Sequence, residues 1–255
     1  MENLGSALGW GLVVGASLLA GGAVAAVLRL PSSVAATITA FGGGILFSAV
    51  ALELVPDADA EAGPALTAAG LLAGTLIYVG ADAWLNRNQE MKMSRRAMHA
   101  AAAGRGMEMP ADRSEVARGE SIAAGLFVDG VPESIALGLT IAEGELGVAL
   151  LAGIVVGNLV EAYGAAQPII AGGRSRGFAI AILGLIGVAL VVATVVGGTV
   201  LADASPELIG TTQAIAAGAV LAVVSIAVIP HAFDEVSSLV ATATMAGFIA
   251  GYLLS

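Results

Sequence analysis

The sequence contains no cysteine, which excludes disulfide bonds, thiolate zinc sites and cysteine-bound iron–sulfur clusters. It is also poor in charge, because only 12% of its 255 residues are charged, whereas a soluble domain has roughly 25%. Basic residues are the scarcest: ten Lys and Arg stand against twenty Asp and Glu, for a net charge of −10. Because nucleic-acid binding needs a basic patch, no nucleic-acid partner is expected.

Apolar residues are in excess: 58% of the chain is hydrophobic, and the mean hydropathy is +0.93. A soluble fold of this size exposes too much surface to hide so many of them from water. A helix of about 20 apolar residues spans a bilayer. Eight such stretches occur, at roughly 7–28, 34–55, 64–84, 121–142, 146–170, 177–201, 208–229 and 236–254. We therefore predict an all-α polytopic membrane protein with eight transmembrane helices, in which residues 1–255 form a single transmembrane domain.

All ten basic residues fall on one side of the predicted bilayer. They lie in the connections after the first, third and fifth spans: Arg29, Arg87, Lys92, Arg95, Arg96, Arg105, Arg113, Arg118, Arg174 and Arg176. The opposite connections hold none, and an excess of positive charge marks the cytoplasmic side. We expect a multi-pass protein of the cell (inner) membrane, with both termini outside and a cytoplasmic 85–118 loop between helices 3 and 4. The acidic outer connections would concentrate cations.

Two pairs of segments resemble each other. Residues 41–61 and 215–235 share five residues in register: Gly44/Gly218, Val50/Val224, Pro56/Pro230, Ala58/Ala232 and Glu61/Glu235. Residues 125–139 and 153–167 share a Gly, a Val and the pair Glu133/Glu161. In each pair the two spans run in opposite senses. Both matches therefore indicate inverted-topology repeats, which are typical of transporters.

Ionisable residues deep in a span are costly, so they are functional candidates. Asp129 and Glu133 lie four residues apart and share one helix face, as do Asn158 and Glu161 on the next span. Pro132 removes a backbone donor and predicts a locally opened helix. If the two spans pack together, these side chains converge without any Lys or Arg to neutralise them. We expect Asp129, Glu133, Asn158 and Glu161 to bind a cation, protons or both; hydrogen-bonded packing by protonated carboxyls is the alternative.

Weaker candidates lie near the ends of the spans. Glu53 lies near the outer end of the second span, where an entry or gating role competes with simple exposure at the interface. His231, Asp234 and Glu235 follow a proline at the cytoplasmic side, where they form either an exit site or a polar loop. Gln213 is a further residue that could line a path.

These features resemble the ZIP (Zrt/Irt-like) family of divalent metal transporters. The likeness lies in the eight spans, the outside termini, the long loop after span 3, the 129–134 segment (Asp-Gly-Val-Pro-Glu-Ser), the Asn158-x-x-Glu161 motif and the 229–231 segment (Ile-Pro-His). The resemblance implies a mobile bundle of spans 1, 4, 5 and 6 on a scaffold of spans 2, 3, 7 and 8. It also implies alternating access and a homodimer formed through the scaffold.

The sequence departs from the family's His-Asn-x-Pro-Glu-Gly pattern at several positions. Asp129 replaces the His, Gly130 the Asn and Ser134 the Gly, and Gly157 stands where the family often has a ligand on span 5. Many members also place an acid on span 6, and 178–201 contains none, which argues against a binuclear site. Oxygen-only ligands favour harder ions such as Mn²⁺, Mg²⁺ or Ca²⁺ over Zn²⁺.

We therefore expect a secondary transporter that moves a divalent metal cation (Zn, Mn, Fe, Mg or Cd) toward the cytoplasm. The metal is the substrate, no prosthetic group is expected, and the other partners are the lipid bilayer and a second copy of the chain. The alternative is a transporter of a different solute in which the carboxylates carry only protons. An enzyme is not expected, because the only histidines are His99 and His231 and no paired His motif occurs.

Overall fold

The computed structural model describes residues 2–85, 115–144, 146–171, 174–201 and 204–255. Every regular element in these residues is a helix. They are α1 (Glu2–Val27), α2 (Ser32–Ala49), α3 (Val55–Leu85), α5 (Glu115–Ala142), α6 (Val148–Ala171), α7 (Arg176–Val195), α8 (Pro206–Val223), α9 (Ile229–Val236) and α10 (Leu239–Leu254), with the π-helical turns η1 (Val50–Leu54), η2 (Val196–Val200) and η3 (Val224–Val228). Most of the predicted 85–118 loop, with His99, lies outside the described residues. Its last residues, 115–118, begin α5.

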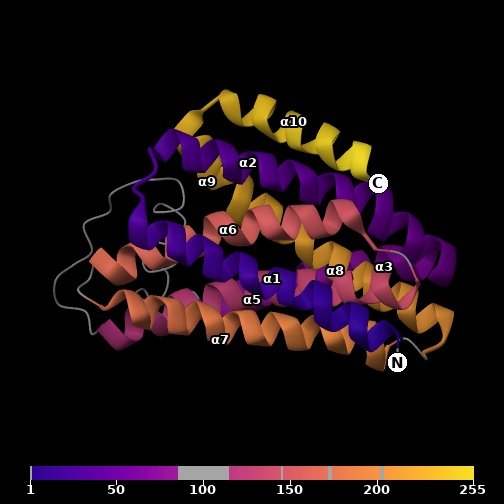
Figure 1. Cartoon of the computed structure of the whole chain (residues 1–255). Helices are drawn as coiled ribbons and strands as arrows, with labels where there is room; N and C mark the ends of the chain where they lie inside the picture. The colour runs from indigo at the N-terminus through magenta and orange to yellow at the C-terminus, as the bar shows by residue number, and fades with distance from the viewer. Residues whose placement is uncertain (1, 86–114, 145, 172–173, 202–203) are drawn as a thin grey trace.

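Six helical stretches are long and apolar enough to cross a membrane, and α10 is a shorter apolar helix. Their outward faces carry large apolar side chains, such as Leu72, Leu76 and Leu185, each more than half exposed. The described part of the chain is thus all-helical, and its apolar helices are those of a multi-pass membrane protein. Figure 1 shows both chain ends at the same end of the helix bundle.

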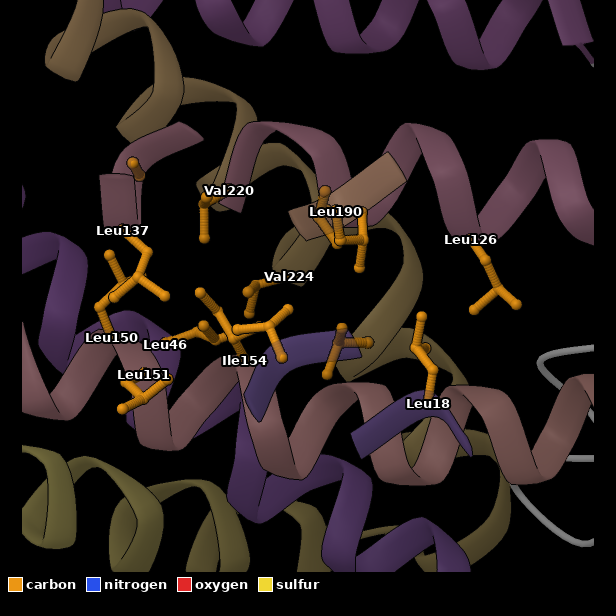
Figure 2. Close-up of a cluster of buried hydrophobic side chains, with 14 of the residues drawn as sticks. Leu18, Leu46, Leu126, Leu137, Leu150, Leu151, Ile154, Leu190, Val220 and Val224 are labelled. Atoms are coloured by element: carbon orange, nitrogen blue, oxygen red, sulfur yellow. The ribbon is translucent and has the colours of Figure 1, made fainter. Parts of the chain in front are cut away.

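The helices form two groups. In the first, α1 packs on α6 and α7, and α5 packs on α7; in the second, α3 packs on α8, and α2 packs on α10. An apolar core joins them: Leu46 and Val220 from the second group and Ile154 from the first belong to one buried cluster, shown in Figure 2. We call these the α5–α6 group and the α3–α8 group.

The connection 56–63 between the second and third predicted spans was expected to be a loop, and the structure shows a helix there instead, broken only at Gly63. One apolar helical stretch runs from Ser32 to Trp84, and its only break in φ/ψ within α3 is at Gly63 (φ 77°, ψ 164°), directly before Pro64. Glycine tolerates this positive φ without steric penalty. The chain therefore turns at Gly63.

Proline explains the two π-helical turns η1 and η3. Pro56 and Pro230 lack the amide that would continue the α-helical ladder. In both cases the amide of the residue before the proline donates a hydrogen bond to the carbonyl five residues back. The Val55 amide donates to the carbonyl of Val50, and the Ile229 amide donates to the carbonyl of Val224. The two segments aligned by sequence thus share the same distortion at the same register.

Glycine lets α2 and α10 approach to backbone contact. A Cβ on Gly44 would overlap the backbone carbonyl of Thr244, and a Cβ on Gly247 would overlap the carbonyl of Phe41. Small residues at such crossings are typical of membrane helices, because they allow close packing.

The α3–α8 pair repeats this arrangement. A Cβ on Gly218 would overlap the carbonyl of Leu71, and a Cβ on Gly74 would overlap the carbonyl of Ile215. Gly218 aligns with Gly44 of the previous pair, and Ile215 aligns with Phe41. The resemblance between the segments therefore extends from residue identity to the contacts each segment makes.

Candidate functional site

The helix α5 carries the two most deeply buried carboxylates among the described residues. Asp129 is 1% exposed and Glu133 is 6% exposed, and they lie one turn apart on the same face. The expected local opening is absent, because α5 stays helical through Pro132. What remains is the missing hydrogen bond: proline has no amide to donate to the carbonyl one turn earlier.

A tyrosine that the sequence analysis did not single out contacts the first of these carboxylates. The Tyr78 hydroxyl donates a hydrogen bond of 2.7 Å to Oδ1 of Asp129. Tyr78 comes from α3 and is 2% exposed, so this bond crosses between the two helix groups away from water. The sequence signal for Tyr78 was the single polar atom of its side chain in a largely apolar span.

The helix α6, which carries Asn158 and Glu161, packs against α5. Asn158 is 2% exposed, and its Nδ2 donor has no hydrogen-bond partner. Ser134, directly after Glu133, is fully buried, and its hydroxyl also lacks a partner. Glu161 is half-buried. An unsatisfied buried polar group costs about 1–3 kcal/mol, so such atoms indicate a place where a water molecule binds.

Charge compensation from basic side chains is lacking along both spans. Neither Gly125–Ala142 nor Val148–Gln167 contains a Lys or Arg. Within the described part of the chain, no three His, Cys, Asp or Glu side chains are close enough together to hold a metal ion. Asp129, Glu133 and Glu161 therefore do not form such a group in this conformation.

An apolar layer separates the carboxylates from the end of the molecule that holds both termini. Leu137 lies one turn beyond Glu133 on α5, and Ile154 lies one turn before Asn158 on α6. Both are fully buried, together with Leu46, Leu150 and Val220 (Figure 2). These five side chains, here called the apolar layer, come from both helix groups. Buried apolar side chains therefore lie between Glu133 and that end along α5 and α6.

The predicted entry residue, Glu53, lies in η1, and its carboxylate reaches the start of α6. Its buried Oε2 has no hydrogen-bond partner and would lie 3.0 Å from a Cβ on Gly147, directly before α6. The carboxylate also interacts with the backbone of Ala149 and Leu150, in the first turn of α6, and with the side chain of Ser255. A carboxylate at a helix N-terminus is stabilised by the partial positive charge of the unsatisfied amides. Because η1 belongs to the α3–α8 group, this contact also joins the two groups.

A second polar contact lies near the same end. Gln213 of α8 is fully buried, and its Nε2 donates a 3.4 Å hydrogen bond to Oε2 of Glu143, which follows the last residue of α5. The buried Oε1 of Gln213 has no hydrogen-bond partner. Among the described residues, polar contacts between the groups thus occur beside the apolar layer as well as at Asp129.

The predicted exit residues fall in α9 and not in a loop. Asp234 is exposed and Glu235 is half-buried, at the end of this eight-residue helix. His231 lies in its first turn, and its side chain is outside the described part of the chain. The helix packs against α2.

Comparison with known proteins leaves the function to be argued from the chain itself. No family model and no curated protein matches the sequence. The features that carry functional weight are therefore the buried carboxylates, the two helix groups and the contacts between them.

Proposed function

We propose that the protein is a membrane transporter that carries a divalent metal cation toward the cytoplasm by alternating access. One observation carries this proposal: Asp129 and Glu133 are buried one turn apart in the apolar stretch Gly125–Ala142, whose sequence contains no Lys or Arg. Two negative charges in such a place repel each other and lose their hydration. A divalent cation bound by oxygen ligands relieves both penalties.

The arrangement of the helices supports eight crossings. The stretch Ser32–Trp84 has 53 residues, or about 80 Å of helix, whereas the hydrocarbon core is about 30 Å thick. The turn at Gly63 divides it into two crossings, and α10 adds another to the remaining long helices. The count then equals that of the ZIP-like architecture, and the two helix groups correspond to its mobile bundle and its scaffold.

Alternating access needs two arrangements of the helix groups with similar energies, and an inverted repeat supplies these two arrangements. The matched π-helical turns before Pro56 and Pro230, and the matched glycine contacts of the α2–α10 and α3–α8 pairs, support such a repeat. The α3–α8 group would serve as the scaffold, against which the α5–α6 group moves. The apolar layer would then be the closed outer gate.

The proposed ligand atoms indicate the class of ion, and the acidic residues near the termini indicate the direction of transport. The proposed ligands are the carboxylates of Asp129, Glu133 and Glu161 and the side-chain amide oxygen of Asn158, and such oxygen ligands suit Mn²⁺, Mg²⁺ or Ca²⁺ more than an ion that prefers sulfur or nitrogen. The described acids at the end that holds the termini are Asp57, Asp59, Glu61, Glu143 and Glu207. They would attract cations to that mouth, so uptake would run from it toward the cytoplasm.

Metal uptake into proteoliposomes tests the proposal. Wild type, Glu133→Ala and Glu161→Ala would be compared over a panel of Mn²⁺, Zn²⁺, Fe²⁺, Mg²⁺ and Cd²⁺. The proposal expects uptake of at least one ion by wild type and its loss in both variants. Unchanged flux in both variants would refute the site. Thermal stabilisation of the purified protein by the transported ion separates a metal carrier from a proton carrier on the same scaffold.

A further inference from the structure

We infer that Tyr78 is a positioning residue of the cation site, which holds the carboxylate of Asp129 in its binding orientation from the opposite helix group. This inference deepens the proposed function and rests on it. It assigns a role to a residue that the motifs on α5 and α6 do not contain.

The geometry supports a strong and specific hydrogen bond. The distance between the Tyr78 hydroxyl and Oδ1 of Asp129 is 2.7 Å, and both residues are at most 2% exposed. Hydrogen bonds to an ionised acceptor are stronger than neutral ones, and exclusion of water strengthens them further. A phenol hydroxyl also adds no positive charge. It therefore orients the carboxylate without neutralising the site for a cation, as Lys or Arg would.

The part of α3 that carries Tyr78 packs closely against α8. Gly74, one turn earlier, touches the backbone carbonyl of Ile215 on α8 with no room for a side chain. The next residue, Thr75, donates a 3.2 Å hydrogen bond to the carbonyl of Gly218. The tyrosine thus extends from the closely packed α3–α8 pair, which is the rigid support that a positioning residue requires.

The second buried tyrosine provides a matched control. Tyr163 is 5% exposed, and its hydroxyl accepts a 2.8 Å hydrogen bond from the Leu30 amide, in the connection between α1 and α2. The substitutions Tyr78→Phe and Tyr163→Phe each delete one buried hydroxyl and one short hydrogen bond. Only the first deletes a bond to a proposed ligand. Loss of stability alone would be common to both.

The experiment measures thermal stabilisation of the purified, full-length protein by Mn²⁺ alone and by Zn²⁺ alone, together with KM and maximal rate of uptake in proteoliposomes. For Tyr78→Phe we expect a roughly 10- to 100-fold weaker apparent affinity and a matching rise in KM, as is typical when the hydrogen-bond partner of a metal ligand is removed. For Tyr163→Phe we expect wild-type affinity, even if the melting temperature falls. In the Asp129→Asn background, Tyr78→Phe should weaken binding no further, because the tyrosine acts through that carboxylate.

The outcomes separate this inference from the proposed function. If wild type binds a metal and Tyr78→Phe binds it as tightly as Tyr163→Phe does, Tyr78 has no positioning role. Additive losses in the double variant would overturn the inference too, because the tyrosine would then act independently of Asp129. If wild type neither binds nor transports any ion of the panel, the proposed function fails, and the inference fails with it.

Discussion

Gly74 of α3 touches the backbone carbonyl of Ile215 of α8, and no side chain fits between the two helices at that point. The substitution Gly74→Ala would push this pair apart. We expect it to destabilise the protein by about 1–3 kcal/mol, which is the usual penalty for overpacking. Thermal unfolding in detergent measures the effect.

Gly80 of the same helix is the matched control, because a Cβ there meets no atom within 4 Å. Gly80→Ala should be neutral or slightly stabilising, since alanine favours a helix more than glycine does by about 1 kcal/mol. Equal destabilisation by the two substitutions would mean that the close α3–α8 contact does not limit stability.

The substitution Glu133→Gln should separate stability from activity. Replacing a buried carboxylate by an amide of the same shape removes a desolvated charge, so the melting temperature in the absence of metal should stay the same or rise. Metal uptake should fall by more than about tenfold, because the amide is a weaker cation ligand than the carboxylate. A variant that transports normally would exclude Glu133 as a ligand.

Glu207→Gln serves as the control for this substitution. Glu207 is an exposed acid in the first turn of α8, so its neutralisation removes one charge without touching the buried site. Its uptake should match that of wild type apart from a small change in KM.

Weakening the contact between Glu53 and α6 should open the outer gate more often. Because the chain has no native cysteine, a single cysteine at the fully buried Leu150 reports access from outside. In a Glu53→Ala background, labelling of Leu150→Cys by a membrane-impermeant thiol reagent should speed up roughly two- to fivefold. This factor corresponds to about 0.3–1 kcal/mol for a carboxylate at a helix N-terminus.

A cysteine at Leu8 provides the reference rate for this measurement. Leu8 is 42% exposed, near the start of α1, and Leu8→Cys should react equally fast with and without Glu53. If the Leu150→Cys rate also stays constant, Glu53 does not hold the gate.

Cysteine labelling also tests the orientation of the protein in the membrane. With both termini outside, Gly5→Cys should react with an impermeant reagent on intact cells, whereas Leu28→Cys should react only after permeabilisation. Leu28 is 54% exposed and lies beside Arg29, so the membrane and not burial would protect it. The reverse pattern would place the acidic mouth in the cytoplasm and reverse the proposed direction of uptake.

Much of the fold could be predicted from the sequence because apolar composition acts through a simple rule. A span of apolar residues buries its backbone polar groups in helical hydrogen bonds whatever its neighbours are, so an all-helical chain with several membrane-length helices followed directly. The same reasoning marked Asp129 and Glu133, since a carboxylate in such a span is notable in any fold. The alignment of 41–61 with 215–235 was also visible, and the structure adds that both segments bend at the same register.

Local patterns were less reliable where two effects compete. Proline and acidic residues in 56–63 indicated a loop, but the π-helical turn before Pro56 accommodates the missing amide and the helix continues to Gly63. Likewise, Pro132 does not open α5, because packing on both sides holds the helix together.

The sequence by itself determined that this chain is helical and apolar enough for a membrane, and that acidic residues lie within its predicted membrane spans. Each of these properties depends on residue type and spacing alone. Tertiary structure alone decided which side chains from distant segments meet. The Tyr78 hydroxyl reaches Asp129, and Glu53 reaches the first turn of α6, because α3 packs on α8 and α2 packs on α6. No one-dimensional pattern encodes those pairings, since they follow from how the surfaces of several helices fit together at once.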